Sequence, residues 1–206
     1  MSYTASSAPV RGALNPSEYE LIDSDPHFNR VVGYMRPSDY AVWGASAVGF
    51  PLALVGMERL QSSAGPYKAA TKIPGGAIRF TTFLGLTGGF LWAYIRSSQR
   101  FLGWQENARE VKLDRYEIKK SLSQEKLPYH ENESLLDDRL QDLANRNSQN
   151  SVTLLAFVPF FNFAHHPYHG VNIAKYYETR PGEESWGFDN LKPFEEIKAK
   201  YTKKIE

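Results

Sequence analysis

Three histidines in the motif HHPYH are the residues whose type and spacing come nearest to chemistry in this chain. His165, His166 and His169 could converge on a metal ion in an extended loop, since imidazole nitrogens are common metal ligands. The motif differs from the zinc-binding pattern HExxH, and Pro167 interrupts the helix that would place His165 and His169 on one face. We therefore expect these histidines to lie on the surface or to contact a partner. A membrane-bound metalloenzyme that uses them is the remote alternative.

No other group of residues forms a recognisable catalytic pattern. The chain has no cysteine, which excludes disulfides, thiolate catalysis and cysteine-ligated metal clusters. The pair Gly75-Gly76 is not a phosphate-binding loop, because no Lys-Ser or Lys-Thr follows it. The acidic pair Glu183-Glu184 is expected to be solvated. The sequence thus predicts no catalytic, cofactor-binding or metal-binding residues and no cofactor.

Overall charge and the N-terminal residues exclude further classes of protein. Lys and Arg number 24 against 23 Asp and Glu, so the balanced charge gives no electrostatic case for binding nucleic acid. The first 25 residues contain Arg11 as their only basic residue beside several acids, which fits neither a secretory signal peptide nor a basic mitochondrial presequence. Any organelle targeting must then be read from internal segments.

Two uncharged apolar segments are the elements that are expected to organise the rest of the chain. The first, Tyr40 to Met57, has 18 residues, which as a helix cover about 27 Å, close to the ~30 Å hydrocarbon core of a bilayer. The second, Phe80 to Ile95, reaches spanning length when Ala77 and Ile78 join it and the arginines at positions 79 and 96 extend towards the headgroups. We predict a transmembrane hairpin with spans at about 40–58 and 77–96. A pair of buried helices in a soluble protein is the alternative.

Small residues recur at every fourth position in both predicted spans. Ala45, Gly49 and Ala53 share one face of the first span, and Gly85 and Gly89 share one face of the second. This spacing lets helix backbones approach closely, so we expect these residues to pack against each other or against a neighbouring helix. The uncharged segments 40–57 and 80–95 contain no Asp, Glu, Lys, Arg or His, which argues against a pump or transporter core.

The hairpin divides the chain into four predicted parts. Residues 1–38 form an extended, proline-containing arm, and residues 39–127 hold the hairpin with a polar helical continuation of its second span. Residues 128–150 form a polar linker. Residues 151–206 form a tail whose aromatic side chains come at irregular intervals, as in a strap that lies over a partner. The predicted partner anchors are Tyr168, Tyr176, Tyr177, Trp186, Phe188 and Phe194.

The helical continuation after the second span is expected to have one solvated face and one apolar face. Only Gly103 interrupts its run of good helix formers before Pro128. The expected apolar stripe consists of Phe101, Leu102, Trp104, Val111, Leu113, Tyr116 and Ile118. The chain is thus predicted to be an all-α membrane protein, made of a two-helix transmembrane hairpin, a long polar helical extension and extended, aromatic-rich terminal arms.

An acidic, proline-containing arm and three further segments together carry a resemblance to a known family. The segments are DYAVWGASAVGFPLALVGMERL, IRFTTFLGLTGGFLWAYIRSSQRFLGWQENARE and HHPYHGVNIAKYYETRPGEESWGFDNLKPFEE. In this combination the chain resembles the fungal 21 kDa accessory subunit of mitochondrial respiratory complex I (NADH:ubiquinone oxidoreductase) over most of its length. The distinctive feature is the hairpin together with the aromatic tail, since the spans alone would match many small membrane proteins.

The resemblance implies a supernumerary subunit of the membrane arm of complex I in the mitochondrial inner membrane. Such a subunit has no redox cofactor or catalytic residue and stabilises core subunits and their lipids, so its partners are other membrane-arm subunits and inner-membrane phospholipids, not nucleic acid. A membrane-anchored assembly factor of a respiratory complex is the second hypothesis, since it would show the same hairpin but bind transiently. Six basic residues near the termini side of the spans, against four around the loop, favour termini on the matrix side.

Overall fold

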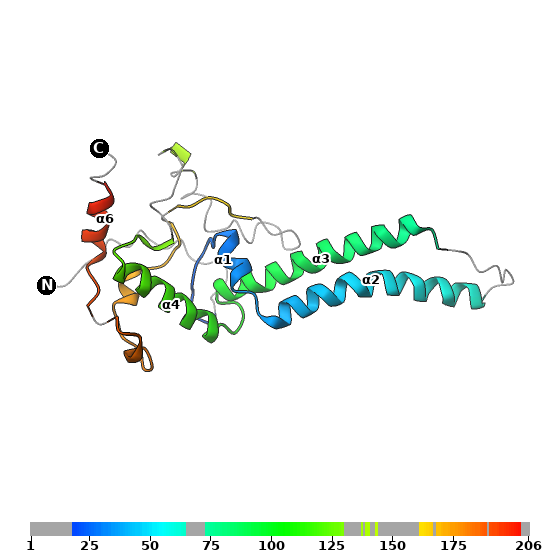
Figure 1. Cartoon of the computed structure of the whole chain (residues 1–206), viewed down its shortest axis with the longest axis horizontal. Coiled ribbons are helices and arrows are strands. Elements are labelled where there is room, and N and C mark those ends of the chain that lie inside the picture. Colours follow the sequence, from blue (N-terminus) through cyan, green and yellow to red (C-terminus); the bar gives the residue numbers. More distant parts are fainter. Residues whose placement is uncertain are drawn as a thin grey trace. The chain divides into compact units, whose positions relative to one another are not determined.

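The regular structure of the chain is helical. The computed structural model describes residues 18–64, 73–129, 137, 139–140, 143, 161–166, 168–188 and 190–202. No strand occurs among these residues, although His27 and Asn162 form one isolated bridge. The elements are α1 (Phe28–Gly33), α2 (Pro37–Ala64), α3 (Gly75–Phe101), α4 (Ala108–Ser123), the 3-10 helices η3 (Ile173–Tyr176) and η4 (Glu184–Trp186), and α6 (Phe194–Thr202), as Figure 1 shows.

The chain divides into two compact units. The hairpin unit is Val31–Ser97, and the tail unit combines the described residues of Met1–Arg30 with those of Ser98–Glu206. This grouping cuts across the four parts predicted from the sequence. Residues from before the hairpin fold together with residues from after it, and the predicted extended arm contains the short helix α1. Most of the predicted linker 128–150 lies outside the described residues.

The hairpin unit consists mainly of α2 and α3, which contain the two predicted spans. Pro37 opens α2, where the missing N–H of a proline costs nothing, and the Asp39 side chain accepts a hydrogen bond from the Arg36 N–H at 2.8 Å. In α3 the hydroxyls of Thr82 and Thr87 donate to carbonyls one turn earlier, at 2.8 Å each. These bonds satisfy polar groups on an otherwise apolar helix.

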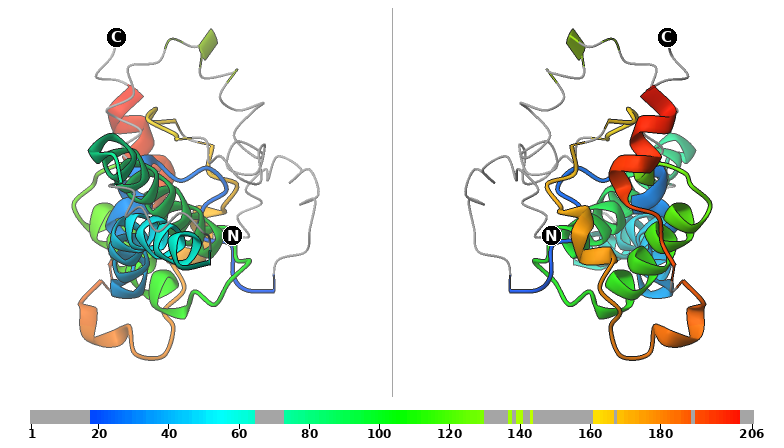
Figure 2. Two further views of the ribbon diagram at one scale, coloured as in Figure 1. Left: turned by 90° about the vertical axis from the view of Figure 1, so that its right-hand side faces the viewer. Right: turned by 90° about the vertical axis from the view of Figure 1, so that its left-hand side faces the viewer.

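The backbones of α2 and α3 meet at glycines of α3. The two helices lie side by side in the views of Figures 1 and 2. A Cβ placed on Gly85 would overlap the carbonyl oxygen of Ser46, and one on Gly89 would lie 2.8 Å from the Ser46 Cβ. Next to this contact the Trp43 indole N–H donates to the Leu86 carbonyl oxygen at 2.9 Å. Glycine is therefore required at these two positions by the closeness of the partner backbone.

The membrane prediction receives unequal support from the two helices. Among the described residues, the Pro37–Gln61 stretch of α2 is the one helix that is long and apolar enough to cross a membrane. The helix α3 does not reach that level, because glycine and threonine occupy much of the predicted second span. The all-helical character of the prediction is confirmed for the described residues. A membrane hairpin of two spans is not confirmed by length and composition.

The predicted continuation of the second span is interrupted, and this prediction was wrong. The helix α3 ends at Phe101, and α4 begins only at Ala108. Gly103 has a φ of +73°, and the Trp104 N–H donates to the Gln99 carbonyl oxygen at 2.9 Å. This is the usual way in which a glycine in the left-handed region ends a helix. The polar segment after α3 is consequently a separate helix.

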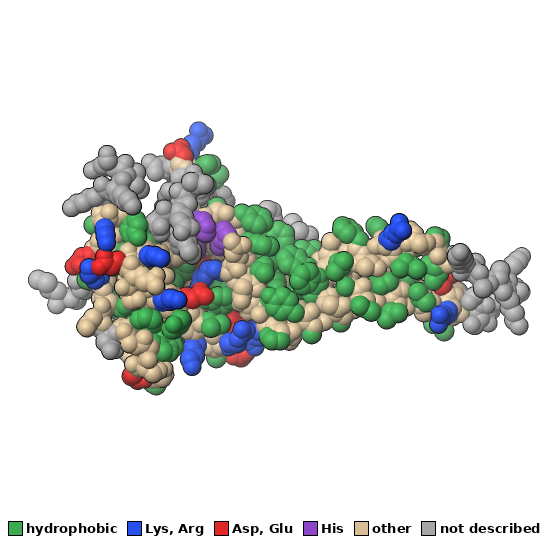
Figure 3. Space-filling model, viewed as in Figure 1, with side chains coloured by type: hydrophobic (Ala, Val, Ile, Leu, Met, Phe, Trp, Pro, Cys, Tyr) green, Lys and Arg blue, Asp and Glu red, His purple; other side chains and the backbone are tan. Residues whose placement is uncertain are grey.

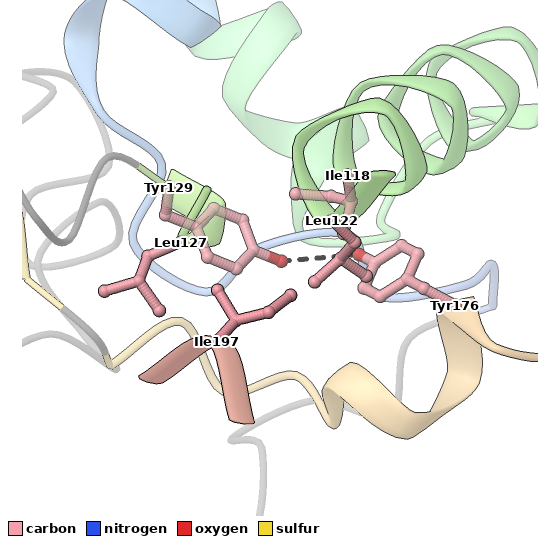
Figure 4. Packing of buried hydrophobic residues seen from close by; sticks show 6 residues of the cluster. All are labelled: Ile118, Leu122, Leu127, Tyr129, Tyr176 and Ile197. Carbon is pink, nitrogen blue, oxygen red and sulfur yellow. Dashed lines mark hydrogen bonds between the residues drawn. The ribbon is translucent and has the colours of Figure 1, made fainter. Parts of the chain in front are cut away.

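The tail unit has a small apolar core on one side of α4. Figure 4 shows how its members point towards each other from different parts of the chain. The aliphatic members from α4 are packed against side chains from the turn after α4, from η3 and from α6. The core therefore joins the tail to α4 within one chain. Its buried members are Ile118, Leu122, Leu127, Tyr129, Tyr176 and Ile197.

The glycine contact makes the first testable prediction. Gly85→Ala should destabilise the hairpin by about 1–3 kcal/mol, because the added methyl group must push the two backbones apart. Thermal unfolding of the full-length chain in mild detergent, followed by circular dichroism, measures the change.

Gly88→Ala is the matched control for this experiment. Gly88 lies in the same helix with nothing within 4 Å of an added Cβ, so alanine should leave stability unchanged or raise it by up to ~1 kcal/mol. Equal unfolding temperatures for the two variants would show that the backbones do not meet at Gly85.

Candidate functional site

The helix α4 turns a mainly charged face into the tail unit. Its buried residues follow a spacing of three and four, as expected for one face of a helix. Leu113 and Tyr116, which belonged to the predicted apolar stripe, are instead 38% and 40% exposed. Within α4 the stripe was therefore predicted on the wrong face, although Ile118 is buried as expected, as are Phe101 and Leu102 before the helix. The buried residues are Glu110, Asp114, Arg115, Ile118, Lys119 and Leu122.

Arg115 and Lys119 are neutralised by one carboxylate from the tail, Glu183. The Arg115 guanidinium binds both carboxylate oxygens, with 2.9 Å between Nη2 and Oε2, and the Lys119 ammonium lies 2.8 Å from Oε2. The same two cations also donate to the carbonyl oxygen of Glu178, at 2.6 and 3.2 Å. We call Arg115, Lys119 and Glu183 the carboxylate clamp. It fixes the tail around η4 to α4 through paired charges, the usual condition for burying charges at all.

The clamp corrects the expectation that Glu183 is solvated. Glu183 is only 8% exposed, whereas its neighbour Glu184 is exposed. Burial opposes ionisation of Glu183, but the hydrogen bonds from Arg115 and Lys119 outweigh it and lower the pKa of Glu183 to about 2. Sequence alone gave no reason to separate the two acids of this pair, because the partner cations lie more than 60 residues away.

A second buried network links α1 to α4 and η3. Arg30 donates to Asp23 at 3.1 Å and to Asp114 at 2.6 Å. The Tyr176 hydroxyl donates to the other oxygen of Asp114 at 2.6 Å and receives a hydrogen bond from the Tyr129 hydroxyl at 3.3 Å. Burial raises the pKa of Asp114 despite the opposing charge of Arg30, and burial likewise raises the pKa values of both tyrosines.

The HHPYH motif completes this network from the tail side. His169 is buried, with its Nδ1 2.8 Å from Asp23 Oδ1 and its Nε2 2.7 Å from the His166 carbonyl oxygen. Burial would lower the pKa of His169, but the charge of Asp23 and the hydrogen bond to it raise that pKa above the ordinary 6.5. Conversely, burial would raise the pKa of Asp23, but His169 and Arg30 hold it below 3.8.

The other two histidines of the motif also have partners in the chain. His166 is buried with its Nε2 3.0 Å from Asp25 Oδ2, and its Nδ1 accepts the Tyr168 N–H at 3.1 Å. His165 stacks on His27, with ring centroids 4.3 Å apart. The expectation of a surface location is wrong for His166 and His169. Both nitrogens of each of these rings are occupied, and no group of three suitable side chains forms a metal site within the described residues.

The aromatic side chains predicted as partner anchors contact this chain. Tyr176 is fully buried in the core, which corrects its predicted role because no surface is left for another protein. Trp186 and Phe188 both pack against the Tyr116 ring, with centroids 5.4 and 5.6 Å apart. Phe194 packs against the core of the tail unit. These parts of the predicted strap hold the tail to α4.

The remaining two predicted anchors are less enclosed. Tyr168 is half-buried beside His166, with ring centroids 6.4 Å apart. Tyr177 is 36% exposed and donates its hydroxyl hydrogen to the Lys192 carbonyl oxygen at 2.7 Å. Contact of these two rings with a partner stays a prediction.

The small residues predicted for helix packing fall into two groups. Gly85 and Gly89 contact α2, as described above. Ala45, Gly49 and Ala53 line an open apolar groove on α2, and nothing lies within 4 Å of a Cβ built on Gly49. The structure thus brings the glycines of α3 against Ser46 and Trp43 rather than against the Ala45 face. Packing of Ala45, Gly49 and Ala53 against another helix stays a prediction.

Sequence reasoning missed the acids and cations of both buried networks. Asp23 and Asp25 lie in the predicted extended arm, and Arg30, Asp114 and Arg115 read as ordinary surface charges. One signal was available, since the spacing of Asp114, Arg115 and Lys119 places them on one helix face. That face carries opposite charges without being apolar, so periodicity alone could not show that it is buried.

Comparison with known proteins gives consistent results over most of the chain. Residues 16–106 match the family model described as NADH-ubiquinone oxidoreductase complex I, 21 kDa subunit, and residues 115–204 match the model for the C-terminal part of that subunit. The chain is also 39% identical over 183 residues to the NADH-ubiquinone oxidoreductase 20.9 kDa subunit of Neurospora crassa. That alignment covers 89% of this chain and 94% of the Neurospora protein.

The carboxylate clamp makes the second testable prediction. Glu183→Gln should destabilise the tail unit by about 3 kcal/mol, because it leaves the buried Arg115 and Lys119 charges without a counter-charge. Glu184→Gln, which changes the exposed neighbour, should change stability by less than about 0.5 kcal/mol. Urea unfolding of the full-length variants in detergent compares them.

The pH profile of the same experiment gives an independent readout. The pKa of Glu183 is lowered, so its contribution is present above pH 4.5 and is lost as pH falls towards about 2. The free energy of unfolding of the wild type should therefore fall towards that of Glu183→Gln as pH is lowered across that interval. A difference in free energy of unfolding that does not change with pH would contradict the clamp.

Proposed function

Because this chain belongs to the 21 kDa subunit family of NADH-ubiquinone oxidoreductase complex I, we propose that it is a non-catalytic accessory subunit of the membrane arm of that complex, in the mitochondrial inner membrane. Its role is to stabilise the core membrane subunits around it. Its partners are those subunits and the phospholipids of the inner membrane. The family relation supports membership of the complex, and the properties of the two units support the finer statements.

The apolar outer surface of the hairpin unit is the observation that carries the membrane role. Val48, Leu52 and Leu60 on α2 are all more than half exposed, as are Phe80 and Phe83 on α3. On the face shown in Figure 3, apolar side chains extend along both helices and charged ones lie towards the helix ends. An uncovered surface of this kind requires lipid or another apolar protein surface.

The tail unit supports a structural role rather than catalysis. Its buried ionisable groups are used to bind one segment of the chain to another, as Glu183 binds Arg115 and Asp23 binds His169. Each carboxylate already has a cation within hydrogen-bonding distance. Groups arranged in this way stabilise a scaffold. We propose that redox chemistry belongs to other subunits of the complex.

The packing of α2 against α3 supports a hairpin whose two ends emerge on one side of the membrane. The glycines of α3 allow a close pair of helices, and such a pair can enter the bilayer with its backbone hydrogen bonds satisfied. The basic residues flanking the spans favour the matrix side for both termini. The tail unit would then fold in the matrix.

Deletion of the gene and complementation test the proposed function. Without the protein, the amount of intact complex I on native gels should fall, while NADH oxidation per assembled complex stays unchanged. Complementation with the full-length chain should restore the complex, with the subunit present in stoichiometric amount. A chain lacking residues 151–206 should restore it poorly.

Two results would reject this proposal in different ways. Normal assembly with lost turnover per complex would mean that the chain takes part in chemistry. Binding only to assembly intermediates, with no copy in the finished complex, would identify a membrane-anchored assembly factor instead.

The proposed topology gives a separate prediction. The protein should stay in the membrane pellet after carbonate extraction, and protease added to mitoplasts should cut within residues 65–72 but spare the tail. Epitope tags on that loop and at the C-terminus report the two sides. Digestion of the C-terminal tag in intact mitoplasts would show the opposite orientation. Release of the protein by carbonate would reject the membrane hairpin.

A further inference from the structure

His169 occupies a site that only a protonated imidazole satisfies. Its Nδ1 faces a carboxylate oxygen of Asp23, and its Nε2 faces the His166 carbonyl oxygen, at 2.8 and 2.7 Å. Both neighbours are acceptors, whereas a neutral imidazole carries a single N–H. A neutral His169 would therefore leave one buried acceptor facing a lone pair. The geometry requires the imidazolium.

His166 differs although its ring stacks on that of His169, with centroids 4.8 Å apart. Its Nδ1 accepts the Tyr168 N–H, while its Nε2 lies 3.0 Å from Asp25 Oδ2 and 3.2 Å from Asn162 Nδ2. A single N–H on Nε2 is enough to bond Asp25, because Nδ1 acts as an acceptor. His169 thus needs two N–H groups to satisfy its partners, whereas His166 needs one.

We propose that this junction is a proton-dependent latch, in which the His169 imidazolium holds tail residues 161–170 onto the N-terminal segment 18–28 and loosens that attachment when it loses its proton. Other contacts also join the two segments: the Asn162 side-chain N–H donates to the Asp25 carbonyl oxygen at 3.1 Å, His166 lies 3.0 Å from Asp25, and His165 stacks on His27. The Ser24 N–H donates to the His169 carbonyl oxygen at 2.9 Å, and the Phe28 N–H donates to the Asn162 carbonyl oxygen at 2.7 Å. The latch concerns the tail unit itself and does not depend on the proposed role in the membrane.

The charged groups around His169 decide what happens on deprotonation. Asp23 and Asp25 face the motif from the N-terminal segment, Arg30 approaches from α1, and Tyr129 stacks on the His169 ring at 3.9 Å. Asp114 of α4 lies beyond Arg30, which it binds. When His169 loses its proton, Asp23 keeps its bond to Arg30 at 3.1 Å. The N-terminal segment therefore stays attached to α1, and the contact that weakens is the one to the tail.

A later part of the tail is attached by groups that do not titrate near neutral pH. The carboxylate clamp uses a guanidinium, and Glu183 has a pKa of about 2. The two attachments therefore respond differently. The attachment of residues 161–170 weakens as pH rises, and residues around η3 and η4 remain on α4.

The direction in which the latch responds to pH follows from the shifted pKa values of His169 and Asp23. The pKa of His169 is raised, so its contribution is complete below about pH 6.5 and is lost as pH rises through the raised value. The pKa of Asp23 is lowered, so its contribution is complete above 3.8 and is lost as pH falls through the lowered value. The latch is closed most firmly between these limits and opens on the alkaline side.

Hydrogen exchange of the full-length chain in detergent tests the latch. Between pH 6 and 9.5, after correction for the intrinsic exchange rate, the opening equilibrium of amides in residues 161–170 should rise above about pH 6.5. The rise should approach tenfold per pH unit and level off at the pKa of His169. Amides in residues 175–183 should show no such change. Titration of the ¹³C-labelled histidine ring gives the His169 pKa directly, and it should exceed 6.5.

Variants assign the effect to His169. In His169→Gln the exchange of residues 161–170 should be fast and independent of pH, whereas His165→Gln, which alters the neighbouring stacked ring, should keep the pH response. Asp23→Asn should lower the pKa of His169 and move the opening to lower pH. An unchanged opening equilibrium across the pH range in wild type, or a His169 pKa at or below 6.5, would overturn the proposal even if a variant failed to fold.

Discussion

The need to pair buried charges on α4 determines how the tail unit is assembled. Asp114, Arg115 and Lys119 face inward, and a buried charge without a partner costs several kcal/mol. None of their counter-charges comes from α4 itself. Arg30 approaches from before the hairpin and Glu183 from the tail, so the helix can be buried only when both segments are in place. The apolar core around Ile118 and Tyr176 is small, and the ion pairs specify which segments pack against it.

The hairpin unit is organised by a different constraint. Its two helices have few charges and many exposed apolar side chains, so pairing of charge contributes little to its specificity. Close contact of backbones at Gly85 and Gly89 sets how α2 and α3 meet, and the Trp43 hydrogen bond to the Leu86 carbonyl oxygen fixes their register. Shape decides the packing in this unit, whereas electrostatics decides it in the tail unit.

The sequence predicted the helices better than it predicted the site. Uncharged runs of spanning length identified α2 and α3, since a long apolar segment of this length usually forms a helix. It also gave the family, because the hairpin and the HHPYH-containing tail occur together. The helix break at Gly103 was missed, since one glycine in a run of helix formers is often tolerated. The buried networks were missed because Asp23, Arg115 and Glu183 become partners only after the chain has folded. A charged side chain looks the same in sequence whether it is solvated or paired.

The long sequence separation between the members of these ion pairs sets the order in which the protein can mature. Asp23 and His169 are 146 residues apart, and Asp25 and His166 are 141 apart, with the entire hairpin between them. During synthesis the acids of the N-terminal segment emerge long before their histidines. Loop closure over such a distance must precede any gain from the contact. The tail unit therefore cannot complete its folding until residues 161–170 have been synthesised, and until then residues 18–30 are available to chaperones.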